Sequence, residues 1–353
     1  MKVTDLPTPA LLLDLEFLSR NAAIMDEIRK GTSMELYPHY KSHKCVEIAR
    51  LQLEWGAKGI TCAKLSEAMD LCDAGIENIV IANQIVQQEK LPVLAALSTR
   101  CRLTVCADHA ENVLALERAV AEVDGKLHVL VEYDVGMGRC GVSSAREVLA
   151  LGKRIEAQPH LVFEGIQAYA GQLSHEEDGE KRFADVQRIE ADVAAVKAFC
   201  EENGLTVREV CGGSTGFAHE KPRNTVYTQV QFGSYLFLDR SFQPLDLQFE
   251  QALFVQTTVL STKEDRVVVD CGVKTMTMDQ YPPYFPAFPG AQLNFSEEHT
   301  TIPVRDHNLV PGDKLLYVPG HCCTTINTFD KVFVAENGEV VDCWDITSRG
   351  KAQ

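Results

Sequence analysis

The sequence predicts an α/β protein in which a (β/α)8 barrel, the TIM-barrel architecture, precedes a C-terminal β domain. Eight short apolar segments alternate with helical patterns over about 240 residues, which is the element count of such a barrel. A doubly wound open sheet is the competing architecture, but the glycine fingerprint that usually follows its first strand does not occur there. Beyond the eighth segment, the pattern changes to short strands without long helical segments between them.

The eight predicted barrel strands have nearly continuous apolar content, as expected for strands that are buried on both faces. They span Met34–His39, Gly59–Ala63, Asn78–Asn83, Arg102–Ala107, Leu127–Asp134, Val162–Tyr169, Val207–Cys211 and Gln229–Phe232. Helical patterns precede the first strand or fill gaps between strands, at Glu16–Lys30, Lys64–Ala74, Asp108–Val123, Ser143–Glu156 and Glu180–Asn203. The predicted capping residues of three of these helices are Ser66, Asp108 and Ser143.

The C-terminal part of the chain predicts a separate β domain. Its strands span Phe254–Thr262, Arg266–Asp270, Lys314–Val318, Lys331–Ala335 and Glu339–Cys343. Asn337 and Gly338 form a hairpin signal between the last two strands, and the proline-rich stretch Tyr281–Pro289 predicts a loop. We therefore expect residues 1–245 to form the barrel and residues 246–353 to form the β domain, which the first few residues of the chain could join.

The charge balance is strongly acidic, with 34 Lys and Arg against 50 Asp and Glu and a formal net charge of −16. This balance argues against nucleic-acid and membrane partners, because nucleic acids and anionic membrane surfaces both attract basic proteins. The N-terminal residues lack a signal-peptide pattern, and no apolar stretch of ~18 residues occurs. We expect a cytoplasmic protein whose 12 cysteines are reduced thiols, most of them packed in the core.

In a barrel, catalytic side chains lie at the C-terminal ends of the strands. Lys41 follows the first predicted strand, where a partly desolvated amine suits Schiff-base chemistry; a solvated basic turn is the alternative. Arg139 follows the fifth strand in a glycine-rich loop, where its planar guanidinium suits an oxyanion; an exposed arginine in a connecting turn is the alternative. Tyr169 ends the sixth strand and could hydrogen-bond a ring nitrogen, unless it is a tyrosine at the edge of the core.

Glycines and hydroxyl side chains gather where the last two predicted strands end. These residues are Gly212, Gly213, Ser214 and Thr215 at the seventh strand, and Gly233 and Ser234 at the eighth. Backbone N–H groups and a helix N-terminus at this place commonly hold phosphate in barrels of this kind. The two segments together indicate a phosphorylated ligand, whereas either segment alone is a weak signal.

A candidate metal site follows the third predicted strand of the β domain. If the segment is extended, His321 and Cys323 point to the same face, because side chains two apart in a strand share a face. An imidazole and a thiolate suit zinc or a similar ion, with water or substrate completing the coordination. The alternative is a buried thiol beside a hydrogen-bonded histidine, which is the more common arrangement for a single H-x-C pair.

The segment Tyr37–Lys44 resembles the P-H-x-K-x-H-K signature of the D-threonine aldolase / D-serine dehydratase family, whose members are alanine-racemase-like pyridoxal-phosphate enzymes of fold type III. The resemblance extends over nearly the whole chain. It includes Thr8–Ala10, Ser66–Ala68, Asp134–Gly141, Gln167–Gly171, Gly212–Gly216, Gly233–Tyr235 and Pro319–Asp330. The Gln-Ala-Tyr segment and the closing Ser348–Lys351 are similar to the branch that processes 3-hydroxy-D-aspartate.

The resemblance implies a role for each candidate residue. Lys41 would form the Schiff base with pyridoxal 5'-phosphate, Arg139 would hydrogen-bond its phenolic oxygen, and Tyr169 would face its pyridine nitrogen. The glycines and hydroxyls of the last two barrel strands would hold the phosphate. His321 and Cys323 would bind a divalent metal, which is zinc, manganese or magnesium. A homodimer with a small D-amino acid as its substrate is also implied.

The function that follows is a metal-assisted lyase of β-hydroxy D-amino acids. We favour dehydration of D-serine or 3-hydroxy-D-aspartate, because aldolases of the family often carry an aspartate where this chain has Cys323. D-threonine or 3-hydroxy-D-aspartate aldolase is the alternative. A non-catalytic pyridoxal-phosphate homeostasis protein would lack the second domain. A racemase of this fold would need a residue such as tyrosine in the second domain, to act as the acid on the face opposite the lysine. Lys274 and Arg240 are candidates for binding a second substrate carboxylate.

Overall fold

A computed structural model describes residues 1–220 and 225–353, which pack as two compact units. The barrel unit comprises Glu27–Lys41, Ile48–Gly233 and Lys351–Gln353. The β unit comprises Met1–Asp26, Ser42–Glu47 and Ser234–Gly350. The division expected between residues 245 and 246 stays a prediction.

The described part of the barrel unit contains one parallel sheet of eight strands, in the order β2-β9-β8-β7-β6-β5-β4-β3. The strands are β2 (Glu35–Leu36), β3 (Ile60–Cys62), β4 (Asn78–Gln84), β5 (Arg102–Ala107), β6 (Leu127–Glu132), β7 (Leu161–Ala168), β8 (Glu209–Gly212) and β9 (Gln229–Val230). A parallel bridge between His39 and Thr61 connects the two ends of the sheet. The sheet therefore curls back to its start, and the predicted (β/α)8 barrel is confirmed.

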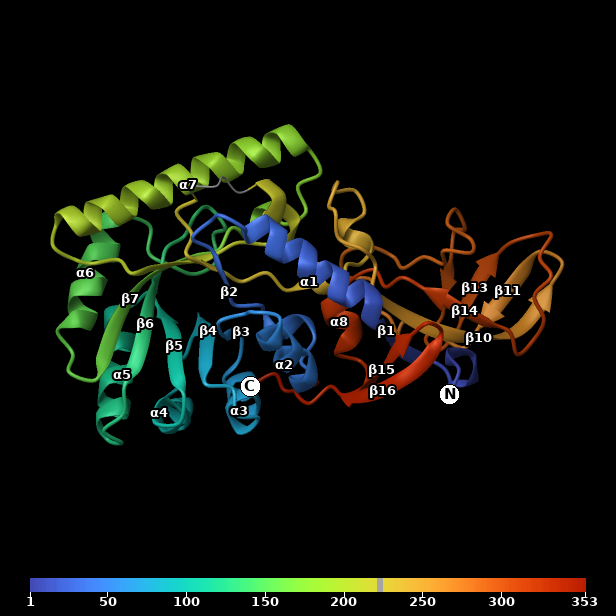
Figure 1. Cartoon of the computed structure of the whole chain (residues 1–353), viewed down its shortest axis with the longest axis horizontal. Helices are drawn as coiled ribbons and strands as arrows, with labels where there is room; N and C mark the ends of the chain where they lie inside the picture. The colour runs from blue at the N-terminus through green and yellow to red at the C-terminus, as the bar shows by residue number, and fades with distance from the viewer. Residues whose placement is uncertain (221–224) are drawn as a thin grey trace. The chain divides into compact units, whose positions relative to one another are not determined.

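Helices follow most of the barrel strands and surround the sheet (Figure 1). They are α3 (Leu65–Asp73), α4 (Leu91–Ser98), α5 (Ala110–Ala121), α6 (Ala145–Glu156) and α7 (Gly179–Glu202). Two further helices, α1 (Leu15–Arg29) and α2 (Val46–Glu54), each contain residues of both units. The predicted helices were placed correctly to within two residues at each end, whereas α2 and α4 were not predicted.

The predicted capping residues Ser66, Asp108 and Ser143 are wrong. The Nδ1 atom of His109 caps α5 by accepting a hydrogen bond from the Glu111 backbone N–H. Ser144 caps α6, so the chain enters this helix one residue later than the pattern indicated. A histidine outside the preferred set of capping residues gives no signal of its own in a sequence.

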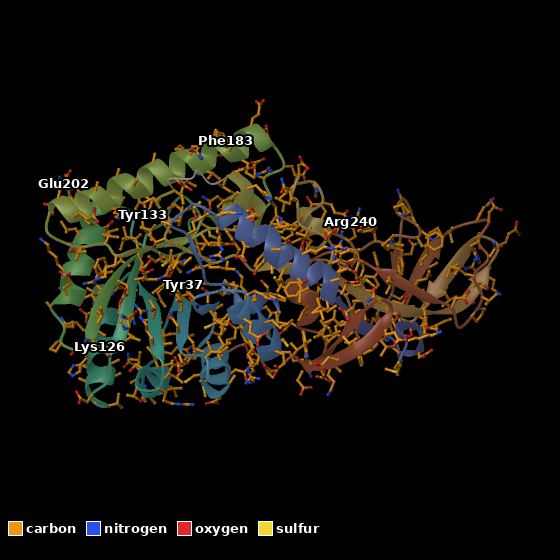
Figure 2. All side chains as sticks on the ribbon, viewed as in Figure 1. Tyr37, Lys126, Tyr133, Phe183, Glu202 and Arg240 are labelled. Carbon is orange, nitrogen blue, oxygen red and sulfur yellow. The ribbon has the colours of Figure 1, made fainter. Side chains whose placement is uncertain are left out.

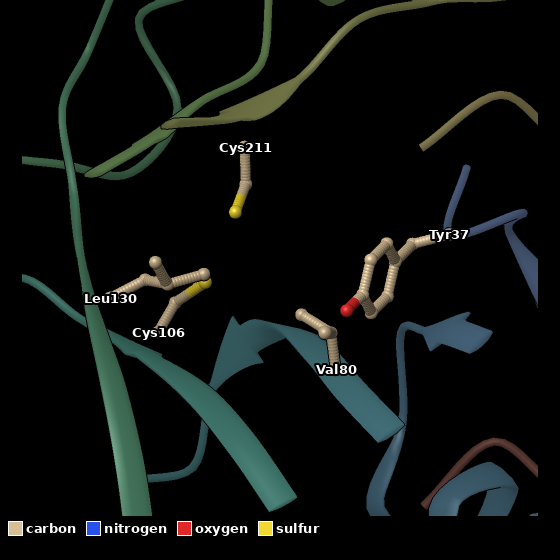
Figure 3. Packing of buried hydrophobic residues seen from close by; sticks show 5 residues of the cluster. All are labelled: Tyr37, Val80, Cys106, Leu130 and Cys211. Atoms are coloured by element: carbon tan, nitrogen blue, oxygen red, sulfur yellow. The ribbon is translucent and has the colours of Figure 1, made fainter. Parts of the chain in front are cut away.

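Small and aromatic side chains fill the interior of the barrel (Figure 3). One cluster contains Tyr37, Val80, Cys106, Leu130 and Cys211, each 5% exposed or less. Burial raises the pKa of the Cys106 and Cys211 thiols well above the ordinary value, so both thiols stay neutral. These cysteines therefore pack as small apolar side chains, as expected for most cysteines of the chain.

The described part of the β unit contains a second sheet in the order β12-β13-β11-β10-β1-β15-β16, with β14 paired to β10. The strands are β1 (Ala10–Asp14), β10 (Leu253–Lys263), β11 (Arg266–Val269), β12 (Asn294–Phe295), β13 (Thr300–Pro303), β14 (Lys314–Tyr317), β15 (Lys331–Glu336) and β16 (Glu339–Asp345). All pairs are antiparallel except β1 with β15. The predicted hairpin turn is confirmed, because Asn337 and Gly338 both have positive φ, at 51° and 77°.

The segment around the predicted metal ligands is not extended. His321 has extended backbone angles, but Cys322–Ile326 forms the short helix α8, which places Cys323 in a helical turn. The buried Asp239 carboxylate accepts a hydrogen bond from the Cys322 backbone N–H at 2.7 Å, which satisfies a donor at the start of this turn. The argument from strand periodicity was therefore wrong for this pair.

No helix within residues 1–220 or 225–353 is both long and apolar enough to cross a membrane.

Candidate functional site

The cofactor-binding candidates of the barrel unit lie after its parallel strands. Lys41 lies in the 3-10 turn Tyr40–Ser42, which follows β2. The buried Tyr40 hydroxyl donates a hydrogen bond to Asp70 Oδ2 at 2.7 Å and anchors this turn to α3. The turn that carries Lys41 is thus fixed by packing, which differs from a loose, solvated basic turn.

Lys41, Tyr169 and Arg139 come together in the barrel unit. Lys41 Nζ lies 5.6 Å from the centre of the Tyr169 ring, and the Arg139 guanidinium carbon lies 5.5 Å from it. Both distances allow attraction between a cation and the ring face. Two cations and one phenol from three different strand ends therefore meet at one place, as the strand-end argument predicted.

Gly171 leaves the space that the Tyr169 ring occupies. A Cβ atom on Gly171 would lie 2.5 Å from Tyr169 Cε1 and 2.9 Å from Met137 Cε. Neither distance is compatible with van der Waals contact, so any side chain at this position would displace the ring. This glycine is accordingly a steric requirement of the arrangement around Lys41.

The loop that carries Arg139 is held by carboxylates. Asp134 Oδ1 accepts hydrogen bonds from the backbone N–H groups of Gly136, Met137 and Gly138, at 2.8 to 3.1 Å. Arg139 lies 3.8 Å from the carboxylate of Glu132, the last residue of β6. Burial raises the pKa of Glu132, although hydrogen bonding from Gln84 and the charge of Arg139 act against that rise. The side chain of Arg139 is half exposed, which leaves part of its guanidinium accessible to a ligand.

The candidate phosphate residues of the barrel unit lie at the end of β8. Gly212 is the last residue of this strand, Gly213 has a φ of 89°, and Thr215 begins the 3-10 turn Thr215–Glu220. The Ser214 hydroxyl lies 2.7 Å from the hydroxyl of Ser174, which comes from the segment after β7. Ser174 was not among the sequence-predicted residues, because nothing in its local pattern distinguishes it from an ordinary loop serine.

The remaining phosphate candidates are adjacent in the sequence but divide between the units. Gly233 ends the barrel-unit segment Ile48–Gly233, and Ser234 begins the β-unit segment Ser234–Gly350. Ser234 begins the 3-10 turn Ser234–Leu236. Within the β unit, the Ser234 hydroxyl lies 3.7 Å from Cys323 Sγ, so Ser234 groups with the metal-ligand candidates.

The metal-ligand candidates His321 and Cys323 contact each other in the β unit. Their side chains are hydrogen-bonded, and His321 Nδ1 also lies 2.7 Å from Asp279 Oδ2. Cys322 Sγ lies 3.8 Å from Cys323 Sγ. Among the residues that the structure describes, no group of three or more His, Cys, Asp or Glu side chains is arranged to hold a metal ion. The pair would therefore supply two ligands and leave other positions to water or substrate.

The electrostatics of this pair favour a thiolate at Cys323. The hydrogen bond from Cys322, together with the hydrogen bond and charge of His321, lowers the pKa of Cys323 well below its ordinary value against the opposing effect of burial. Burial acts to lower the pKa of His321, but Cys323 and Asp279 outweigh it and raise that pKa to about 9. A thiolate, rather than a thiol, is the form of cysteine that binds metal.

The two candidates for binding a second substrate carboxylate have protein partners. Lys274 pairs with Glu297 at 3.0 Å and with Glu298 at 3.4 Å. The side chain of Arg240, labelled in Figure 2, donates to the Pro282 carbonyl at 3.0 Å and lies over the Tyr284 ring. Arg240 therefore serves to fix the proline-rich loop, and the structure gives neither cation a position dedicated to a ligand.

The fold and the strand-end residues define an enzyme of the alanine-racemase type. The family model for the alanine racemase N-terminal domain matches residues 13–241, and the model of a putative serine dehydratase domain matches residues 252–335. The chain belongs to the alanine-racemase-like family and, within it, to the D-threonine aldolase / D-serine dehydratase group that the sequence predicted.

Three similar proteins show how far the likeness extends. The D-threonine aldolase of Arthrobacter sp is 39% identical over 97% of this chain and 93% of its own length. The structure of D-threonine aldolase from Filomicrobium marinum has a TM-score of 0.95 and 34% identity, covering 100% of this chain and 98% of that one. The structure of D-threo-3-hydroxyaspartate dehydratase from Delftia sp. HT23 has a TM-score of 0.89 and 26% identity, covering 98% of both chains. The prediction of an enzyme, a lyase of this family, is confirmed by these likenesses.

Proposed function

We propose that this protein is a pyridoxal-phosphate-dependent, metal-assisted lyase that cleaves the Cα–Cβ bond of D-threonine-like β-hydroxy amino acids to give glycine and an aldehyde. The observation that carries the proposal is the contact between His321 and Cys323 in a chain that also brings Lys41, Tyr169 and Arg139 together. A Lewis acid has a use in a reaction at a substrate hydroxyl, whereas racemisation at the α-carbon does not require one.

The residues of the barrel unit fit pyridoxal phosphate. An amine, a guanidinium and a phenol ring converge at strand ends, and a glycine–serine–threonine turn follows β8. Gly212 has a structural role at this strand end, because a Cβ there would lie 2.4 Å from the Ala168 carbonyl oxygen on the neighbouring strand. Two cations beside one ring suit a ligand that carries a phenolate and a phosphate.

The residues of the β unit fit a divalent metal of borderline softness. A thiolate and an imidazole are the donors that zinc prefers, and a site with few protein ligands keeps positions for substrate. A structure of a D-threo-3-hydroxyaspartate dehydratase in which a cysteine is replaced by alanine is a metal-free form, which supports a metal in that relative. Zinc is our proposal for this chain, with manganese and magnesium as the ions to compare.

Each group of residues has a definite task in the proposed reaction. Pyridoxal phosphate, when bound, would withdraw electrons from the substrate α-carbon, and the metal, when bound, would polarise the β-hydroxyl. The Lys41 amine would hold the cofactor aldehyde carbon, and would afterwards move a proton at the α-carbon. Arg139 would hold the phenolic oxygen, and Tyr169 would face the pyridine nitrogen. His321 and Cys323 would orient the β-hydroxyl.

Dehydration is the second candidate reaction, and a specific observation favours it. Cys323 stands where aldolases of the family often have aspartate, which favours a D-serine or 3-hydroxy-D-aspartate dehydratase. Cleavage is favoured by the likeness to the two D-threonine aldolases. The partners of Lys274 and Arg240 further favour a substrate without a second carboxylate.

The products distinguish the candidates. The purified enzyme, loaded with pyridoxal phosphate and zinc, is incubated separately with D-threonine, D-serine and D-threo-3-hydroxyaspartate. Glycine together with acetaldehyde from D-threonine is the expected result, whereas ammonia together with a keto acid would show a dehydratase. Interconversion of alanine enantiomers without either pair of products would show a racemase and overturn the proposal. A homodimer and a cytoplasmic location remain predictions that gel filtration and cell fractionation can check.

A further inference from the structure

We propose that Asp279 is a positioning residue for the metal site: it holds the His321 ring in the orientation that turns Nε2 toward the metal. This inference rests on the proposed metal-assisted function and adds to it a residue that no sequence motif marks. Asp279 lies 42 residues before His321 in the chain, in the stretch that leads into the proline-rich loop.

The contact between the two side chains is close and specific. Asp279 Oδ2 lies 2.7 Å from His321 Nδ1, within the range of a short, charge-assisted hydrogen bond. A carboxylate only accepts, so Nδ1 must carry the proton that this bond uses. The other ring nitrogen, Nε2, is then the atom left to bind a metal.

The other oxygen of Asp279 is also held. Thr324 Oγ1 donates a hydrogen bond to Asp279 Oδ1 at 2.8 Å. Thr277 in turn contacts the hydroxyls of both Thr324 and Thr325, the latter at 3.2 Å. Asp279 is therefore fixed through both oxygens, although its side chain remains 44% exposed.

One short helix carries both the metal ligand and the support for its partner. Cys323, Thr324 and Thr325 are consecutive residues of α8. The hydrogen bond from Thr324 links Asp279 to this helix, so the His321 ring and the Cys323 side chain are held in one frame. Exposed ion pairs contribute little on their own. The hydrogen bond from Thr324 therefore matters, because it holds Asp279 in place beside the His321 ring.

Metal-binding histidines generally donate their second ring N–H to a carboxylate or carbonyl, and removal of that partner costs about 10- to 100-fold in metal affinity. We therefore expect Asp279→Ala to weaken zinc binding by about that factor. Asp279→Asn keeps an acceptor without the charge and is expected to lose less. Thr324→Val, which frees one oxygen of Asp279, is expected to cause the smallest loss of the three.

The test measures zinc affinity directly, by competition between the pyridoxal-phosphate-loaded protein and a fluorescent zinc chelator. Asp265→Asn is the matched control, because Asp265 is an exposed carboxylate of the same unit whose ion-pair partner is Arg266. Cofactor absorbance and the melting temperature of the metal-free protein are recorded for each variant. The expected result is weaker zinc binding in the order Ala, Asn, Val, with unchanged cofactor absorbance and metal-free stability.

Equal zinc affinity in Asp279→Ala and the wild type would overturn the positioning role and leave the proposed function intact. Absence of zinc, manganese and magnesium binding in the wild type would instead overturn the metal-assisted function, and the positioning role with it. If Asp279→Ala does not fold, Asp279→Asn and Thr324→Val decide: affinities equal to the control overturn the proposal. A loss of affinity matched by an equal loss of metal-free stability would show a structural residue, which also overturns it.

Discussion

The two groups of functional residues are built in different ways. Those of the barrel unit lie at the ends of parallel strands, and backbone pairing between neighbouring strands decides which side chains meet. Those of the β unit lie in loops and in one short helix, where the His321 ring is hydrogen-bonded to Asp279 and the Cys322 backbone N–H donates to Asp239. The first arrangement follows from a repeating pattern, whereas the second depends on individual contacts between distant residues.

Lys41→Ala is expected to have the largest effect on the residues of the barrel unit while leaving those of the β unit unchanged. Loss of the amine should abolish both turnover and the visible absorbance of bound pyridoxal phosphate, because no covalent bond to the cofactor can form. The protein should still bind zinc, since the metal ligands belong to the other group. Lys58→Ala, an exposed lysine of the barrel unit, is the control and should keep its colour. A coloured Lys41→Ala protein would show that another amine holds the cofactor.

Removal of the metal should have the opposite pattern of effects, with turnover lost and cofactor binding kept. Chelation of the metal, or Cys323→Ala, is expected to lower turnover by roughly 100-fold or more, because a Lewis acid contributes several kcal/mol to such a step. The absorbance of bound cofactor should persist, and zinc or manganese should restore activity to the chelated wild type but not to the variant. Undiminished turnover in a preparation shown by elemental analysis to be metal-free would remove the metal from the proposed reaction.

Gly171→Ala addresses the packing of the barrel group without removing a functional side chain. The added methyl would lie 2.5 Å from the Tyr169 ring and should move it. We expect about 10- to 100-fold lower turnover, with unchanged zinc affinity, since small misplacements near reacting groups have effects of this size. Absorbance and circular dichroism of the bound cofactor report the displaced ring. Gly204→Ala, where the added Cβ meets no atom within 4 Å, is a control for stability, although its φ of 78° adds some strain.

The smallest effect on turnover is expected toward the N-terminal ends of the barrel strands, away from the ends that carry the cofactor-binding candidates. Glu164 on β7 pairs with Arg102 at 3.0 Å and with His128. Burial acts to raise the pKa of Glu164, but the His128 hydrogen bond and the charges of Arg102 and His128 hold that pKa below its ordinary value. The ionised form is therefore favoured in the folded protein, so this stabilisation is present above the ordinary pKa of a glutamate and is lost as pH falls through the lower, folded pKa.

Glu164→Gln should accordingly lower the free energy of unfolding by about 1–3 kcal/mol at pH 7 while turnover at saturating cofactor stays within about twofold. Urea unfolding of the wild type and the variant, repeated toward pH 3, checks the sign: the difference between them should shrink as Glu164 protonates. A difference that does not change with pH would mean that the carboxylate charge contributes nothing.

The sequence predicted the barrel well because a parallel strand that is buried on both faces has a recognisable composition. Arg102–Ala107 was placed without error, and the other strands were placed to within about three residues at each end. The predicted meeting of Lys41, Tyr169 and Arg139 used one general rule about strand ends, and the structure brings these three side chains together.

The β-unit group was less predictable, for physical reasons. His321 and Cys323 were selected for their chemistry, but their contact arises in a helical turn that Asp239 stabilises from 83 residues away in the chain. Asp279 carries no signal in the sequence, because an aspartate before a proline-rich loop has many ordinary explanations. Tertiary hydrogen bonds of this kind do not leave a periodic pattern.

The position of β1 in the second sheet has a consequence for the synthesis of the protein. This strand pairs with β10 and β15, which are synthesised more than two hundred residues after it. Until then both edges of an apolar strand are open to pairing with other chains. A nascent chain released before β15 is therefore expected to aggregate even if its barrel is complete, and folding of the enzyme depends on translation that reaches the β15–β16 hairpin.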